Sequence, residues 1–169
     1  MSVSRTIGRL IIPIHEGIQV PPLGSSFDPQ EYFGAFYIEN NSVATLQTLT
    51  FNSDQLVGAD LSRLVFCGRA LNERHVDFVE NIVSAEKKKH VHPLILLHLF
   101  CHIPDLLGRL NIGKDYSLHF VSSLPGRCKK TGQEWHLSVS RLNGNNILGV
   151  IRPDDIPPVR GLILFQSAK

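Results

Sequence analysis

The chain has 169 residues, of which 43% are hydrophobic and 19% are charged, and its formal net charge is +2. This length is enough for one domain with a substantial core, and the apolar share excludes an intrinsically disordered chain. The small basic excess permits nucleic-acid binding without requiring it, because dedicated nucleic-acid domains usually carry a stronger basic excess on one face.

Three cysteines, Cys67, Cys101 and Cys128, form an odd set without paired spacing, which indicates free thiols in a reducing compartment. The first residues lack the apolar region and cleavage site of a signal peptide. The longest apolar run, 94–101, is interrupted by His98 and is shorter than the roughly 20 residues that cross a bilayer. We therefore expect a soluble intracellular protein, cytoplasmic or nuclear, without a transmembrane segment.

The first third of the chain has the pattern of β-structure. The β-branched run 6–14 predicts a strand that lies at a sheet edge, because Pro13 cannot donate to a strand ladder. The segments 33–40 and 42–51 predict two further strands. Asn40 and Asn41 lie between them, and asparagine tolerates the left-handed conformation of a tight hairpin.

The middle of the chain predicts helices. The segment 61–71 stays undecided between helix and strand, because a short apolar run fits either. The segment 72–89 predicts a helix with Asn72 as its N-cap and three lysines at its C-terminal end. A second helix is expected to begin at Pro93, since proline suits the first helical position.

The last third returns to β-structure. Residues 116–123 and 134–142 alternate, and the second segment places Trp135, Leu137 and Val139 on one face. The sequence NGNN then predicts a hairpin, followed by a strand ILGVI, a proline-fixed loop 152–160 and a final strand GLILFQ. The order predicts a single α+β domain over residues 1–169, with a largely antiparallel sheet from N- and C-terminal strands and two to three central helices.

The histidine-rich segment 90–104 supports two interpretations. On a helix from Pro93, the donors His98, Cys101 and His102 share one face, and these are residue types that zinc accepts. The other interpretation is a central core helix, because the intervening residues leave no polar face and no HExxH motif is present. We favour the core helix.

We expect no cofactor. The segment 108–115 resembles a phosphate-binding loop, but the predicted order of helix, loop and strand is the reverse of what that loop needs. Asp115 also stands where a hydroxyl would bind magnesium.

A basic loop, 126–133, joins two predicted strands. Arg127, Lys129 and Lys130 could neutralise phosphates, and Trp135 could stack on a base, which makes a nucleic-acid contact one hypothesis. The alternative is a solvated hairpin tip with Trp135 facing the core, and this alternative is favoured.

Cys128 is the best candidate for a reactive thiol, because the cations of the basic loop would stabilise its thiolate. His136 or His119 could then serve as its base. The sequence has no complete motif of a zinc hydrolase, a phosphate-binding loop or a serine hydrolase.

The first hypothesis is therefore a non-enzymatic interaction or assembly module that docks onto a partner protein or onto copies of itself. The first strand and the final apolar strand beside the loop 152–160 are the expected docking edges, with Ile11 and Leu162 as contact residues. A nucleic-acid-binding module is the second hypothesis. A thiol- or zinc-dependent enzyme is the third.

Overall fold

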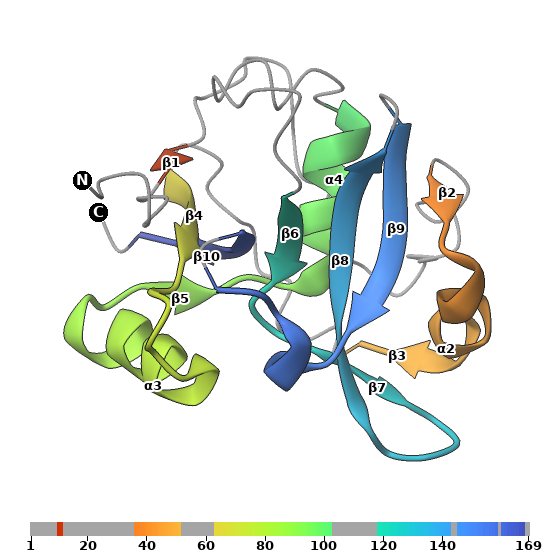
Figure 1. Cartoon of the computed structure of the whole chain (residues 1–169), viewed down its shortest axis with the longest axis horizontal. Coiled ribbons are helices and arrows are strands. Elements are labelled where there is room, and N and C mark those ends of the chain that lie inside the picture. The colour runs from red at the N-terminus through yellow and green to blue at the C-terminus, as the bar shows by residue number, and fades with distance from the viewer. Residues whose placement is uncertain are drawn as a thin grey trace.

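The computed structural model describes residues 10–11, 36–51, 63–102, 118–142, 145–158 and 160–167, and it has an α+β fold built on a mixed sheet (Figure 1). Its strands are β1 (Leu10–Ile11), β2 (Tyr37–Ile38), β3 (Leu49–Thr50), β4 (Leu64–Gly68), β5 (Lys89–His90), β6 (His119–Ser122), β7 (Gly126–Cys128), β8 (Glu134–Leu142), β9 (Asn145–Ile151) and β10 (Gly161–Gln166). Its helical segments are η2 (Asn40–Ser42), α2 (Val43–Thr48), α3 (His75–Glu80), the π-helical η5 (Asn81–Ala85), α4 (Pro93–His102) and η6 (Pro153–Asp155).

The sheet is centred on β10, which pairs with β4 in antiparallel and with β6 in parallel orientation. On its other side β6 pairs with β8 in antiparallel orientation. β8 in turn forms an antiparallel hairpin with β9, in which Leu142 lies opposite Asn145. β2 adds to β9 in parallel, and β7 pairs with both β3 and β8. The prediction of a largely antiparallel sheet is thus right only in part, because two of these pairings are parallel.

Hydrophobic cores lie on both faces of the sheet. Along β10, Leu162 and Leu164 join the core that contains α4, whereas Ile163 and Phe165 join the core that contains α3. β4 divides its side chains in the same alternating way. Strands covered on both faces are expected to be continuous apolar runs, which explains the sequences LVFC and GLILF. The sheet is therefore a central layer between α3 and α4.

The predicted helix from Pro93 is confirmed as α4. Residues 93–100 are all buried, and Leu97 has 0% exposure. The His92 ring accepts a hydrogen bond through Nδ1 from the Leu94 amide at 3.1 Å, which supplies a partner for one free amide of the first turn. Phe100 packs on Phe120 of the sheet with ring centroids 5.3 Å apart. The helix is a core element, as its lack of a polar face indicates.

The strand predicted over 42–51 is wrong for most of its length, because the chain forms α2 there and only Leu49–Thr50 is extended. The Asn40–Asn41 hairpin is wrong as well, since these residues begin the 3-10 turn η2. β-Branched residues disfavour helix only weakly, and tertiary contacts override that preference. Here the Thr48 hydroxyl bonds back to the Thr45 carbonyl at 2.9 Å inside the helix.

The helix predicted over 72–89 is shorter than expected. It begins at His75 after Arg74, because Glu73 is held by hydrogen bonds in the preceding turn. The Glu73 carbonyl accepts from the Arg69 guanidinium at 2.6 Å, and its carboxylate accepts from the Ala70 amide at 3.3 Å. At the other end Lys87 adopts a left-handed conformation with φ 56°, which stops the helical path.

The expected docking edge at the final strand is wrong. β10 is central in the sheet, and Leu162 has 0% exposure. Of the predicted first strand, Leu10–Ile11 is present as β1 on the outer side of β4, and the rest lies outside the described residues. The undecided segment 61–71 contains β4, and the loop-like segment 108–115 lies outside the described residues.

Within the part of the chain that the structure describes, no helix is long and apolar enough to cross a lipid bilayer.

Candidate functional site

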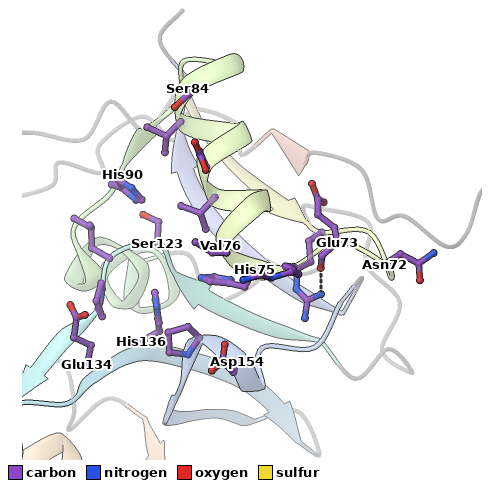
Figure 2. A pocket seen from close by; sticks show the side chains of 18 of the residues that line it. Asn72, Glu73, His75, Val76, Ser84, His90, Ser123, Glu134, His136 and Asp154 are labelled. Carbon is purple, nitrogen blue, oxygen red and sulfur yellow. Dashed lines mark hydrogen bonds between the residues drawn. The ribbon is translucent and has the colours of Figure 1, made fainter.

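A cleft of about 1130 Å³ lies beside α3 (Figure 2). Its lining comes from the turn 69–74, from α3 and η5, from β5, from the connection between β6 and β7, from the start of β8, and from η6. Segments far apart in the sequence thus meet around one space. A large concave site with converging polar side chains is the usual place for a ligand.

His136 forms part of the inner wall. It lies on β8 with 4% exposure, and its Nδ1 is 2.7 Å from the carbonyl oxygen of Ser122. A carbonyl oxygen can only accept, so Nδ1 carries the proton and Nε2 of the neutral ring is an acceptor. Burial lowers the pKa of His136 to about 4; the Ser122 bond opposes this shift, and the nearby His75 and His90 add to it. The ring is therefore neutral at physiological pH.

Two further histidines face the same space. The His75 ring, from α3, meets His136 edge to face with centroids 5.8 Å apart. Its Nδ1 is buried and has no hydrogen-bond partner among the described residues. Burial and the Arg69 charge lower the pKa of His75 against the opposing charge of Asp154, and burial lowers the pKa of His90 on β5. Figure 2 shows the three side chains converging from three elements.

One arginine holds the cleft walls together. Arg69 donates to the Glu73 carbonyl at 2.6 Å and to the Ile156 carbonyl at 2.7 Å. It thereby joins the turn before α3 to the chain just after η6. Because these bonds go to backbone oxygens, the position of the Arg69 guanidinium is fixed by the fold.

The lining is acidic apart from its histidines. Four carboxylates, from Glu73, Glu80, Glu134 and Asp154, face two guanidiniums, from Arg69 and Arg74, which gives a formal net charge of −2 with neutral imidazoles.

Two exposed apolar side chains line the cleft beside its charged residues. Leu71 is 58% exposed and Val76 is 55% exposed. Among the described residues only four large apolar side chains are exposed, and these are two of them. Two of these four exposed side chains therefore belong to the same cleft.

The residues predicted to contact nucleic acid lie elsewhere. All three cations are exposed and lie outside the cleft lining, with Arg127 on β7 and with Lys129 and Lys130 in the turn between β7 and β8. Trp135 is half-buried and packs against the α4 core. The structure therefore groups the three cations but points the indole toward the interior.

The residues predicted to bind zinc lie on α4. His98 is buried with 2% exposure, and Cys101 is half-buried against the α4 core. The backbone of His102 ends the helix. In the described ranges no three His, Cys, Asp or Glu side chains are grouped closely enough to hold a metal ion.

Cys128 has a lowered thiol pKa of about 6, for a different reason from the expected one. The cause is hydrogen bonding by Thr48, then by Thr131 and the backbone of Lys130, rather than the charges of the basic loop. The Thr48 hydroxyl lies 3.2 Å from Sγ and 2.9 Å from the Thr45 carbonyl oxygen. Because it has one proton, it stabilises the thiolate only when that proton turns from the carbonyl to sulfur. The thiol thus has a hydroxyl partner, whereas the candidate base His136 is bonded to Ser122.

Reasoning from the sequence missed the cluster of His75, His90 and His136. One signal was available, because His136 and Ser138 alternate with Leu137 on β8 and lie on the opposite face from Trp135, Leu137 and Val139. Both are in fact buried, with 4% and 7% exposure. No family model, curated protein or solved structure matches this chain, so the cleft itself carries the functional argument.

Proposed function

We propose that the chain is a non-enzymatic interaction module that holds a segment of a partner protein in the cleft beside α3. The observation that carries this proposal is the combination of an open cleft with the exposed apolar side chains Leu71 and Val76 at its rim. Apolar residues at a rim become favourable contacts only when a partner removes them from water.

The lining of the cleft supports a peptide segment over a small metabolite. Small-molecule sites usually have volumes of about 300–1000 Å³ and enclose most of the ligand. This cleft, at about 1130 Å³, is close to the upper end of that range, and it combines apolar side chains with both carboxylates and guanidiniums. An extended segment presents apolar side chains and backbone polar groups together, and therefore fits such a mixed lining.

Catalysis by the histidines has less support. At neutral pH an imidazole with a pKa of about 4 is a weak base. Ser123, one of the two serines that line the cleft, has its hydroxyl bonded to the amide and the carbonyl of Val91, at 2.8 and 3.3 Å. It therefore lacks the base contact of an activated nucleophile.

A nucleic-acid module is the second candidate. The observation in its favour is the exposure of Arg127, Lys129 and Lys130 together at one hairpin tip. The partly buried Trp135 gives this candidate less support, because a stacking platform needs an open ring face.

Site-specific photocrosslinking tests the docking proposal. A photoreactive amino acid is placed at Leu71 on the rim or, as a matched control, at the exposed Val43 of α2, which is outside the cleft. We expect a protein crosslink from position 71 and none from position 43. The crosslink should be lost on Val76→Glu but kept on Val43→Glu. Equal crosslinks from both positions, or capture of a second copy of this chain alone, would reject a partner segment in the cleft.

A further inference from the structure

One end of the cleft offers acceptors for hydrogen bonds. The proton of His136 is held on Nδ1 by the Ser122 carbonyl, so the other ring nitrogen has a lone pair and no N–H. Glu134 is two residues away on β8, and side chains at i and i+2 of a strand lie on the same face. Figure 2 shows Glu134, His136 and His90 at this end and Asp154 near His75 at the other.

This arrangement discriminates by charge. Nε2 of His136 could donate to an anion only after protonation of the ring, which its burial opposes, so that among His90, Glu134 and His136 only His90 has an N–H to offer. A cation needs acceptors and a carboxylate, and these are the groups present. One of the two arginines of the lining, Arg69, is bonded to the carbonyls of Glu73 and Ile156.

We propose that this end of the cleft, formed by His90, Glu134 and His136, is a subsite for a cationic hydrogen-bond donor, the side chain of an arginine or lysine in the partner segment. The proposal rests on the docking function above and names the chemistry of its occupant. The cationic group donates to Nε2 of His136 and is balanced by the Glu134 carboxylate. The apolar neighbours of that arginine or lysine cover Val76 and Leu71 at the rim.

The net charge of the whole cleft lining also favours a bound cation. With neutral histidines the lining has a formal net charge of −2, which one bound cation reduces. Arg127 lies opposite Glu134 in the β7–β8 pair and is the cation that competes for this carboxylate. Since Arg127 and Glu134 are both exposed, water and salt weaken that competition.

Nuclear magnetic resonance of the full chain with ¹⁵N-labelled histidine tests the subsite. The probes are capped tripeptides with two leucines flanking arginine, lysine, glutamine or glutamate. We expect the arginine and lysine peptides to shift the unprotonated ¹⁵N signal of His136 in a saturable way, and the glutamine and glutamate peptides to bind more weakly. Stronger binding of the glutamate peptide, or shifts that leave His136 unchanged, would overturn the proposal.

A pair of variants locates the cation. Glu134→Gln should weaken the arginine peptide about two- to fivefold, the range for a solvent-exposed ion pair, whereas Glu39→Gln, at an exposed carboxylate outside the cleft lining, should leave affinity unchanged. Equal effects of the two substitutions would mean general attraction to an acidic surface and would reject the subsite.

A free amine tests whether the natural occupant of the subsite is a protein side chain or a small free amine. Putrescine should bind less tightly than the arginine peptide, because it cannot cover the apolar rim. Tighter binding of putrescine would reject a protein side chain as the natural occupant. Peptide binding without any partner crosslink at Leu71 would keep the subsite and reject the docking function, so the two failures are distinguishable.

Discussion

The imidazole of His136 donates from Nδ1 to the carbonyl oxygen of Ser122 at 2.7 Å, and this single bond defines the chemistry of the cleft wall. The same serine also accepts a bond from the Leu137 amide through its hydroxyl at 3.1 Å. Ser122 thus holds both the ring and the strand that carries it. The orientation of the acceptor nitrogen follows from backbone geometry at the end of β6, and the ring needs no carboxylate partner to keep its tautomer.

Stability should fall as the pH is lowered from about 6.5 to about 4. The pKa of His136 is about 4 in the folded chain against an ordinary value of 6.5, so in this window the unfolded chain binds more protons. The shift corresponds to roughly 3 kcal/mol, which is fully present above pH 6.5. The lowered pKa values of His75 and His90 act in the same direction, whereas Asp154 opposes the effect at His75.

Urea unfolding at several pH values measures this dependence. His136→Gln removes one titrating group and should make the dependence shallower, while a variant of the half-buried His119 should change it less. A free energy of unfolding that is constant between pH 7 and pH 5 would contradict the burial of neutral imidazoles.

Leu97→Ala should destabilise the chain by roughly 2–5 kcal/mol, because it removes buried methyl groups and leaves a cavity. Leu97 is fully buried on α4, with 0% exposure. Chemical denaturation of the variant and of an exposed control, Val43→Ala, gives the difference. A Leu97 variant as stable as the parent would mean that this face of α4 does not pack in the core.

Gly161→Ala should also destabilise, by roughly 1–3 kcal/mol. A Cβ at Gly161 would lie 2.6 Å from the Pro157 carbonyl oxygen and 2.6 Å from Cγ2 of Ile156, which follow η6 at the cleft. Gly149→Ala is the matched control, because there the closest atom, at 2.5 Å, is the end of the flexible Glu39 side chain. The melting temperature of Gly161→Ala should be lower than that of Gly149→Ala. The reverse order would contradict tight packing under η6.

Cys128 should be alkylated by iodoacetamide with a rate that rises with pH around a midpoint of about 6. Thr48→Val removes the hydroxyl and should move the midpoint upward, while Thr48→Ser keeps it. Peptide mass spectrometry follows the modification of Cys128 separately from that of Cys101. Because Cys128 is buried, its absolute rate also depends on access to Sγ, whereas the midpoint reports the thiolate. The same midpoint in the valine variant would show that Thr48 does not stabilise the thiolate.

Nucleic acid should show no saturable binding at roughly 150 mM salt, where exposed charges are screened beyond about 8 Å. Fluorescence anisotropy with single- and double-stranded oligonucleotides over a salt series measures this. Simultaneous replacement of Arg127, Lys129 and Lys130 by glutamine should then change nothing. Sub-micromolar binding that this triple variant loses would favour the nucleic-acid candidate over the docking proposal.

The elements that were predictable from sequence are those in which one pattern of apolar residues or turn residues dominates. α4 begins at a proline and has no polar face, and β8 and β9 alternate around a strong turn sequence. α2 was not predictable, because Val43–Thr48 has β-branched residues and only Leu46 is buried in it. Local preference there is too weak to decide between helix and strand.

The cleft was less predictable than the fold. His75, His90 and His136 lie on separate elements, and only the pairing of β10 with β4, β5 and β6 brings those elements together. The basic tip, in contrast, is contiguous in sequence and its exposure was expected. Sites assembled from distant segments depend on topology, which periodicity and composition do not specify.

The central position of β10 also has a consequence during synthesis on the ribosome. β4 and β6 are made earlier, yet neither pairs directly with the other, since β10 lies between them. Until residues 161–166 leave the exit tunnel, both strands present one unpaired edge and apolar side chains to solvent. Such edges favour wrong pairing between nascent chains. We expect expression at lower temperature, or with added chaperones, to raise the yield of folded chain more than any change to its surface would.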